Sequence, residues 1–464
     1  MYGEDVTAKE ESMPVAAPHT LNWSHAHIGR LAGLDHGTNP LARREPEMAQ
    51  RLGKELEQAV LPFASLPFRP DLDKDLPKVV QRIGHCRHML LLGIGGSALG
   101  ARAIQKAFAP GQDRPGFNGP WLWIADNVDA GTLDLWLATL NPGETSVVVV
   151  SKSGGTIETL SQYFIVRKWL RDALGNGWRR QVVMVTDEKN GFLRQEADTH
   201  AIASLPVPDH LGGRYSVLSA VGMLPAAFMG VNWQALMDGA ASVSAPLVNN
   251  PCSLGTHPAW KLALWAALLM DKGYSQLIFF TYIPLWACLG AWFSQLWAES
   301  LGKAGKGSMP LPAIGVTDQH SLQQMFLDGP KDKGCLFLHC PALDRGRFFG
   351  EEIPEAWAYL RGSRFGDLLD AEGLGTRMAL AQCQVPLVEL RLAAADEDAA
   401  GRLMMLLELT TVFTGWLLDI NPIDQPAVEL GKRLANARLG ASGYPAEEAA
   451  LAAFLAQKGI ESVF

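Results

Sequence analysis

The chain contains no run of basic residues and no group of closely spaced cysteines. Lysine and arginine number 40 against 48 aspartate and glutamate residues, so the net charge at neutral pH is −8. This balance argues against nucleic acid as a partner, because surfaces that bind nucleic acid are basic. The six cysteines are scattered without the spacing of metal ligands, so we expect reduced thiols and no metal site.

Signals for export or membrane insertion are also scarce. The first residues, MYGEDVTAKEESMP, are acidic and polar, unlike the apolar centre of a secretory signal. The most apolar stretch, Tyr274–Ala298, carries no charged residue, but it contains Pro284, Gly290 and two glutamines. We interpret this stretch as a buried strand followed by a buried helix, and not as a membrane span. We therefore expect a protein of the cytoplasm that has no membrane partner.

Short apolar runs alternate with helical patterns in two parts of the chain. The strands expected in the first part are Met89–Leu92, Trp121–Ala125, Val147–Val150 and Gln181–Thr186. The strands expected in the second part are Leu277–Tyr282, Leu311–Val316, Leu336–His339 and Val385–Leu392. This alternation predicts an α/β fold with two doubly wound parallel sheets, each a three-layer αβα domain. Ligands of such sheets bind beyond the carboxyl ends of the strands.

The same patterns suggest how the 464 residues divide. We expect an N-terminal helical accessory region over residues 1–80, a first α/β domain over 81–215, a second over 216–420, and a C-terminal helical segment over 421–464. The strongly apolar stretch Leu403–Ile420 predicts a helix that lies in the core or in a subunit interface.

Two glycine-rich loops follow strands of the first expected sheet. Gly93–Ser97 reads GIGGS, and Ser151–Thr156 reads SKSGGT directly before a helical stretch. Free backbone N–H groups at a helix N-terminus attract an anion such as phosphate. The alternative is an ordinary turn in which serine and threonine only cap the helix. The pattern G-x-x-x-x-G-K-[ST] is missing, so a nucleotide P-loop is not indicated.

Three further residues suit acid–base or electrostatic chemistry, although each has a structural alternative. Glu299 is the first charge after the uncharged residues 273–298, so it is either a partly buried general base or the point where a helix emerges into water. His320 follows an expected strand and is either a switchable acid and base or a structural histidine. Arg214, behind two glycines, either reaches into a cleft between domains or forms a surface ion pair.

Taken together, six short stretches resemble the phosphoglucose isomerase family. They are Gly93–Ser97, Ser151–Thr159, Gly212–Ser216, Gln295–Lys303, Asp318–Ser321 and Asn421–Lys432, which follow the family's order across roughly 340 residues, from 93 to 432. Gly155 stands where many members have threonine, so one hydroxyl of the expected phosphate site is absent. Ile423 and Pro426 also depart from the commonest residues, but no residue that does chemistry is lost.

The resemblance implies two sugar-isomerase (SIS) domains that interconvert glucose 6-phosphate and fructose 6-phosphate, a step of glycolysis and gluconeogenesis, without metal or cofactor. The implied phosphate-binding residues are Gly96, Ser97, Ser151, Lys152, Ser153 and Thr156, and the other implied substrate contacts are Glu158 and Gln425. Glu299 would move a proton between C2 and C1 through a cis-enediol or enediolate, and Arg214 would stabilise the developing charge. His320 and Lys432 would assist ring opening.

The resemblance also implies a homodimer in which His320 comes from the neighbouring subunit. Three alternatives stay open: an isomerase that also accepts mannose 6-phosphate, a non-catalytic sugar-phosphate sensor, and the sugar-phosphate half of an amidotransferase. The chain has no glutaminase domain with an N-terminal cysteine, which argues against the amidotransferase. The joint presence of Glu299, His320, Arg214 and Lys432 argues against the sensor.

Overall fold

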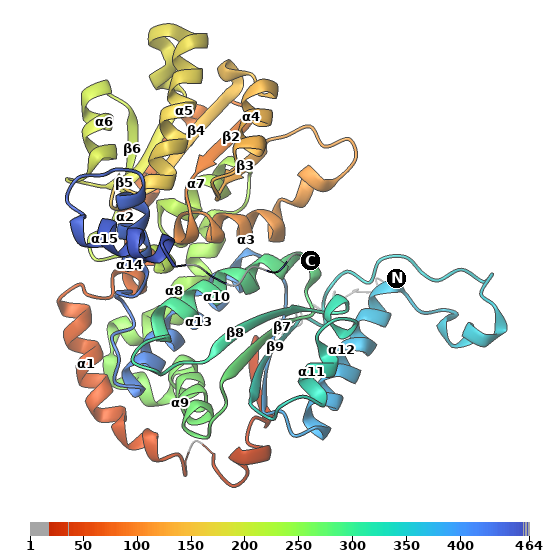
Figure 1. The fold of residues 1–464 in the computed structure, drawn as a ribbon. Coiled ribbons are helices and arrows are strands. Elements are labelled where there is room, and N and C mark those ends of the chain that lie inside the picture. The colour runs from red at the N-terminus through yellow and green to blue at the C-terminus, as the bar shows by residue number, and fades with distance from the viewer. Residues whose placement is uncertain (1–17, 36, 458, 460–461, 463–464) are drawn as a thin grey trace, which may run out of the picture.

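Two five-stranded sheets, each covered by helices, organise the chain (Figure 1). The computed structural model describes residues 18–35, 37–457, 459 and 462. The strand order is β3-β2-β4-β5-β6 in the first sheet and β1-β10-β9-β7-β8 in the second. The expected pair of layered α/β units is therefore confirmed. The polar N-terminal stretch that we interpreted above lies outside the described residues.

The first sheet is parallel throughout. Its strands are β2 (His88–Leu92), β3 (Trp121–Ala125), β4 (Thr145–Ser151), β5 (Val182–Asp187) and β6 (Ala203–Val207). Val147 and Val149 pack on the face covered by α4 (Ala130–Thr139), α5 (Ile157–Leu174) and α6 (Phe192–His200). Val148 and Val150 face the opposite side, towards α2 (Pro70–Ile83) and α3 (Leu99–Phe108). Because successive side chains of a strand alternate between faces, the run of four valines requires burial on both sides.

The second sheet is mixed. The strands β7 (Gln276–Thr281), β8 (Met309–Ile314), β9 (Lys333–His339) and β10 (Leu387–Arg391) are parallel, whereas β1 (Thr20–His25) pairs antiparallel with β10. The expectation of a separate helical region over residues 1–80 is wrong at this point, because β1 is the edge strand of the second sheet. The other domain boundaries stay predictions.

Helices enclose the second sheet and link it to the first. They are α1 (Glu45–Glu57), α7 (Ala220–Phe228), α8 (Trp233–Asn249), α9 (Pro258–Asp271), α10 (Ala287–Leu301), α11 (Gln323–Leu327), α12 (Phe365–Gln382) and α13 (Glu397–Leu417). The apolar helix α13 packs against α8, α9 and α10, and its residues from Leu407 to Leu417 are all buried, so it belongs to the core of this chain. The uncharged stretch before Glu299 forms β7 and α10, as expected. No helix within the described part of the chain combines the length and apolar character needed to cross a membrane.

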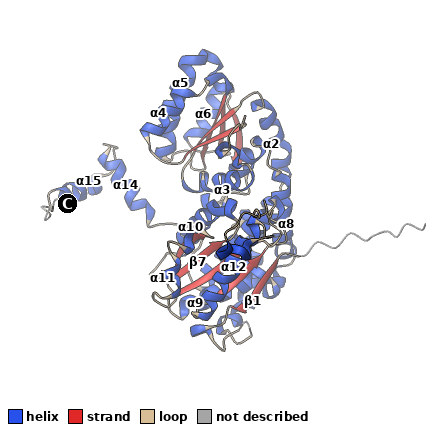
Figure 2. Cartoon of the chain, turned by 90° about the vertical axis from the view of Figure 1, so that its right-hand side faces the viewer, coloured by secondary structure: helices blue, strands red, loops and turns tan. Residues whose placement is uncertain are grey.

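The C-terminal segment extends away from both sheets (Figure 2). It contains α14 (Val428–Arg438) and α15 (Pro445–Leu455). Ala437 is the one buried residue of α14, and every residue of α15 is at least partly exposed. This segment is therefore held to the body of the molecule mainly by the loop of residues 421–427 that precedes it.

Candidate functional site

The two glycine-rich loops lie side by side at the carboxyl edge of the first sheet. The loop of residues 93–97 follows β2, and the loop of residues 151–156 follows β4, which is the direct neighbour of β2. After β2 the chain places β3 on one side and β4 on the other, so the order of the sheet reverses between these two strands. Open α/β sheets bind ligands at such a switch point.

Three hydroxyl groups converge in the loop that follows β4. The Ser151 Oγ lies 2.9 Å from the Thr156 Oγ1, and the Ser153 Oγ lies 3.4 Å and 3.5 Å from these two atoms. Thr156 is the N-cap residue of α5, but its side chain accepts no hydrogen bond from the helix. The capping alternative therefore does not account for Thr156, whose hydroxyl is directed into the loop together with the other two.

Lysine and glycine complete this hydroxyl loop. Burial lowers the pKa of Lys152, although the nearby carboxylates of Asp187 and Asp209 act in the opposite direction. Gly154 has a φ of +63°, and a Cβ there would lie 3.1 Å from the backbone nitrogen of Leu193. The turn therefore depends on glycine at this position. A cation, three hydroxyls and the first turn of α5 together form a concave surface suited to an anion.

A cavity of about 820 Å³ opens beside the hydroxyl loop. It brings together seven residues expected from the sequence: Ser97, Lys152, Ser153, Thr156, Glu158, Gln425 and Lys432. The first five come from the first sheet's loops and α5, and the last two come from the C-terminal segment. The volume is within the range of pockets that bind small molecules.

Arg214 is buried between the two sheets and the C-terminal segment, so a surface ion pair is excluded. It is 3% exposed, and its Nε donates to the Ser300 Oγ at 2.7 Å. Its Nη2 donates to the carbonyl oxygens of Pro422 and Asp424 at 2.7 Å and 3.0 Å. Its Nη1 donates to the Gln425 Oε1 at 2.8 Å. The side chain therefore fixes the C-terminal loop against α10.

Glu299, near the end of α10, is contacted by Arg214 and by Gln295. Its Oε2 lies 3.5 Å from the Arg214 Nη1, and its Oε1 accepts a hydrogen bond from the Gln295 Nε2 at 3.0 Å. The side chain is 33% exposed, which is the partial burial expected for a carboxylate at the end of an apolar helix. Arg214 shares its Nη1 between Glu299 and Gln425, and Gln425 lines the cavity. The carboxylate thus lies next to the cavity wall.

Glycines let the loop after β2 approach this pair closely. A Cβ at Gly96 would lie 2.3 Å from the carbonyl carbon of Gly213, and a Cβ at Gly95 would lie 2.8 Å from the Gln295 Nε2. Neither distance is compatible with a side chain. Gly96 therefore sets the backbone contact that places Ser97 and Arg214 together.

Further contacts that the sequence does not indicate support these residues. The Tyr215 hydroxyl lies 2.9 Å from the Ser300 Oγ, which also receives the Arg214 Nε. The Lys303 Nζ forms an ion pair with the Asp424 Oδ1 at 2.9 Å and donates to the Asn421 carbonyl oxygen. Burial lowers the pKa of Lys303, while Asp424 acts to raise it. The motifs around residues 214, 299 and 421 contained these residues, but nothing local indicated that they pair.

The two remaining candidate residues differ in their surroundings. The Lys432 Nζ, on α14, forms an ion pair with the Glu429 Oε1 at 2.7 Å at the cavity wall. His320 follows β8 on the second sheet, is exposed, and is not among the residues that line the cavity. Within one chain, the structure does not bring His320 to the cavity. Among the described residues, no group of three or more His, Cys, Asp or Glu side chains could hold a metal ion.

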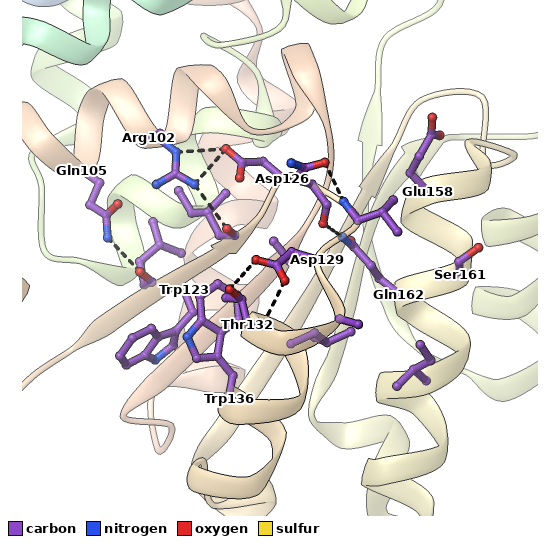
Figure 3. A pocket seen from close by; sticks show the side chains of 18 of the residues that line it. Arg102, Gln105, Trp123, Asp126, Asp129, Thr132, Trp136, Glu158, Ser161 and Gln162 are labelled. Atoms are coloured by element: carbon purple, nitrogen blue, oxygen red, sulfur yellow. Dashed lines mark hydrogen bonds and ion pairs between the residues drawn. The ribbon is translucent and has the colours of Figure 1, made fainter. Parts of the chain in front are cut away.

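A second cavity, of about 420 Å³, is lined by residues of α3, β3, α4 and the N-terminal part of α5 (Figure 3). Glu158 lines both cavities. In the second one, Arg102 forms an ion pair with Asp126 at 2.8 Å and donates to the Ile124 carbonyl oxygen. Gln105 donates to the carbonyl oxygen of Leu122, whose backbone nitrogen donates to the Gln112 Oε1. These side chains form hydrogen bonds with backbone groups on the unpaired edge of the edge strand β3.

The chain thus has two layered α/β units, with a hydroxyl loop at the switch point of the first sheet and a Glu–Arg pair near the cavity beside this loop. These features are those of an α/β protein suited to a small anionic ligand at a sheet edge. The family described as phosphoglucose isomerase matches residues 79–312, which is half of the chain. The chain belongs to this family.

Individual relatives agree with this assignment. The glucose-6-phosphate isomerase of Rubrobacter xylanophilus is 41% identical over 368 residues, covering 76% of this chain and 83% of that protein. A glucose-6-phosphate isomerase of Thermus thermophilus is 35% identical over 423 residues, covering 85% and 97%. A hypothetical protein from Thermus thermophilus has a crystal structure with a TM-score of 0.74 and 34% identity, covering 87% of this chain and 99% of that one. A Chlamydia trachomatis glucose-6-phosphate isomerase has a TM-score of 0.75 at 21% identity, covering 94% and 91%, and shows the shared fold.

Proposed function

We propose that this chain is an aldose–ketose isomerase that interconverts glucose 6-phosphate and fructose 6-phosphate. The observation that carries the proposal is the Glu299–Arg214 pair, which contacts Gln425, a residue that lines the same cavity as Ser153 and Thr156 of the hydroxyl loop. A phosphosugar needs a binding site for an anion at one end and a base at the other. Family membership supports the same reaction.

The phosphate group would bind at the hydroxyl loop. Ser97, Ser153 and Thr156 line the cavity there, and Lys152 supplies a positive charge. Interactions with the phosphate do not change during the reaction. Their binding energy would instead hold C1 and C2 of the sugar in a fixed orientation at the far end of the cavity.

Glu299 would be the base that moves the proton. It removes the C2 proton of the open-chain aldose, the C2–H electron pair forms the C1–C2 double bond, and the C1 oxygen acquires negative charge. A proton then passes from the C2 hydroxyl to the C1 oxygen, and the electron pair left on the C2 oxygen forms the C2=O bond. The electrons of the C1–C2 double bond take up the proton that the same carboxylate returns to C1, so one base serves two adjacent carbons. Arg214 is held by four neighbouring groups, and its preorganised charge would stabilise the enediolate oxygen.

Ring opening comes before this transfer and needs its own groups. The anomeric hydroxyl loses a proton while the ring oxygen gains one and its bond to C1 breaks. Lys432 lies at the cavity wall, and we assign it to this step together with His320. Because His320 is exposed and does not line the cavity of its own chain, we infer a homodimer in which each cavity receives His320 of the partner subunit. We further infer that the enzyme works in the cytoplasm.

The test is a coupled assay that follows glucose 6-phosphate formed from fructose 6-phosphate. We expect turnover by the parent chain, and a loss of about 10³-fold in kcat for Glu299→Gln, which keeps the shape of the side chain and removes its basicity. Exchange of the C2 proton with solvent should disappear in this variant. Binding of fructose 6-phosphate without turnover by the parent would contradict the proposal. Mannose 6-phosphate, assayed in parallel, decides whether specificity extends to the C2 epimer.

A further inference from the structure

The short loop that carries His320 is anchored on its first side by Asp318. The Asp318 Oδ2 accepts a hydrogen bond from the Ile314 backbone nitrogen at 2.8 Å. The Asp318 Oδ1 accepts one from the Ser321 Oγ at 2.5 Å. One carboxylate therefore ties the last residue of β8 to the residue that follows His320.

Gln319 anchors the loop on its second side. Its Nε2 donates to the Tyr282 hydroxyl at 2.6 Å and to the Thr376 Oγ1 at 2.9 Å, with a longer contact of 3.3 Å to the Glu372 carbonyl oxygen. The Tyr282 hydroxyl in turn donates to the Thr376 Oγ1 at 2.7 Å. This Gln319–Tyr282–Thr376 cluster joins the His320 loop to the end of β7 and to α12.

Tyr282, the centre of this cluster, is rigid. A Cβ at Gly315 would lie 2.4 Å from its ring, and a Cβ at Gly373 would lie 3.0 Å from it, so two glycines allow the backbone to close on both sides. Its ring also stacks on Phe337 with centroids 4.9 Å apart. Tyr282 is only 3% exposed. A contact with its hydroxyl therefore fixes the position of Gln319 in space.

The side chain of His320 is exposed at the end of this well-anchored loop. Exposed loops are usually the more mobile parts of a protein. Here, the residue directly before His320 is instead tied to a buried aromatic ring, which reduces the freedom of the histidine backbone. A histidine that must reach the cavity of another subunit benefits from this, because a displacement of about 1 Å costs roughly 10²-fold in rate.

We propose that Gln319, Tyr282 and Thr376 are positioning residues that hold His320 in the orientation in which it serves the neighbouring subunit's cavity. The inference rests on the proposed function and extends it to three residues outside the cavity. It differs from a purely structural role in what it predicts. A structural role changes stability, whereas a positioning role changes kcat through His320 alone.

The first experiment compares Gln319→Ala with the parent. We expect kcat for fructose 6-phosphate to fall by roughly ten- to a hundredfold. We expect KM to change by less than about twofold, because the hydroxyl loop lies on the other sheet. Thr376→Ser keeps the hydroxyl that accepts from Gln319 and Tyr282, so it should retain most of the parent kcat. Gln324→Ala is the matched control, because the only side-chain hydrogen bond of Gln324 among the described residues is to Asp328.

The second experiment asks whether the effect passes through His320. In a His320→Ala background, Gln319→Ala should lower kcat by no more than a further factor of about two. An equal loss in both backgrounds, or an unchanged kcat with only a lower melting temperature, would overturn the positioning role. Thr376→Val repeats the test through a different atom if Gln319→Ala fails to fold. A fully active His320→Ala would instead refute the role of His320 in the proposed function, and the positioning role with it.

Discussion

The two sheets share a fold, but their carboxyl edges are used in opposite ways. At the switch point of the first sheet, between β2 and β4, the loops consist of glycines and small hydroxyl residues, and they border a cavity of about 820 Å³. In the second sheet the order reverses between β7 and β9, and the cavity there measures only about 20 Å³. Its walls include Tyr282, His339, Arg345 and Arg377.

The two cavities differ in volume because different side chains lie at the two switch points. In the second sheet, Arg377 pairs with the buried Glu389, whose Oε2 also lies 3.4 Å from the His339 Nε2. Burial alone would raise the pKa of Glu389, but His339 and Arg377 outweigh this effect and lower it. The second sheet satisfies its own charges, so it serves as a scaffold. The first sheet leaves hydroxyls and backbone groups facing a cavity, so it can accept an anion.

The largest effect is expected in an experiment that tests whether His320, which follows β8 of the second sheet, completes the cavity of another subunit. Glu299→Gln and His320→Ala homodimers should each be nearly inactive. When the two variants are unfolded and refolded together in equal amounts, about half of the dimers combine them. One site of each such dimer then pairs an intact Glu299 with an intact His320, so activity should return to about a quarter of the parent value. Confirmed mixed dimers without activity would show that His320 acts within its own chain.

The next effect concerns the hydroxyl loop itself. The double variant Ser153→Ala, Thr156→Ala removes two of the three converging hydroxyls, and hydrogen bonds to a charged group contribute roughly 1.5–3 kcal/mol each. KM for fructose 6-phosphate should therefore rise by at least about tenfold, and inorganic phosphate should inhibit the parent competitively. Ser161→Ala is the control, because the Ser161 hydroxyl bonds to the Ile157 carbonyl oxygen of its own helix. Equal KM values for the double variant and the control would refute the anion site.

A smaller effect is expected on the pH dependence of stability, where the paired Glu389 differs from Glu408, which has no hydrogen-bond partner among the described residues. Both carboxylate oxygens of Glu408, on α13, are buried without a hydrogen-bond partner among the described residues, and burial raises the pKa of this group well above its usual value. The folded state thus holds the proton more tightly than the unfolded state. The free energy of unfolding should fall as pH rises above the unfolded pKa, by at most about 1.4 kcal/mol per pH unit.

Glu408→Gln removes this dependence. Its melting temperature relative to the parent should increase between pH 5 and pH 8, as measured by thermal unfolding. The depressed pKa of Glu389 has the opposite sign, because its contribution to stability is lost as pH falls. A difference between Glu408→Gln and the parent that is constant over this pH range would mean that Glu408 does not titrate as its burial requires.

The smallest effect is expected from a substitution that adds a hydroxyl to the hydroxyl loop. A Cβ at Gly155 would meet only the Ser153 carbonyl oxygen, at 3.9 Å, so a side chain fits there. Gly155→Thr should lower KM for fructose 6-phosphate by about two- to fivefold, because the added hydroxyl can reach the anion. Gly154→Ala is the contrasting variant, since its positive φ and close neighbours predict reduced stability. An unchanged or higher KM for Gly155→Thr would place the phosphate away from residue 155.

The sequence predicted the strands that are buried on both faces, because uninterrupted runs such as Val147–Val150 need no partner to be recognised. It did not predict β1. No residue of the stretch TLNWSH is buried, and its partner β10 lies more than 360 residues further along the chain, so no local pattern indicates the pairing. A strand at a sheet edge is specified by tertiary contacts more than by its own residues.

The candidate site likewise contains residues that the sequence predicted and contacts that it did not. Glycines, hydroxyls and the end of an uncharged stretch indicated Ser153, Thr156 and Glu299 as candidates. The burial of Arg214 and its bonds to Ser300 and to the Pro422 carbonyl oxygen join residues 86 and 208 positions apart. Spacing in the sequence carries no information about such contacts. The proposed use of His320 by a partner subunit is likewise beyond what one chain's pattern specifies.

The side chains around β3 have a consequence for behaviour at high concentration. An unpaired strand at the edge of a sheet can template the addition of strands from other molecules, which leads to aggregation. At β3, Gln112 accepts from the Leu122 nitrogen, Gln105 donates to the Leu122 oxygen, and Arg102 donates to the Ile124 oxygen. A strand arriving at this edge would first have to break these three bonds. The side chains of Arg102 and Gln105 in Figure 3, together with Gln112, thus protect the edge of the first sheet from uncontrolled self-association.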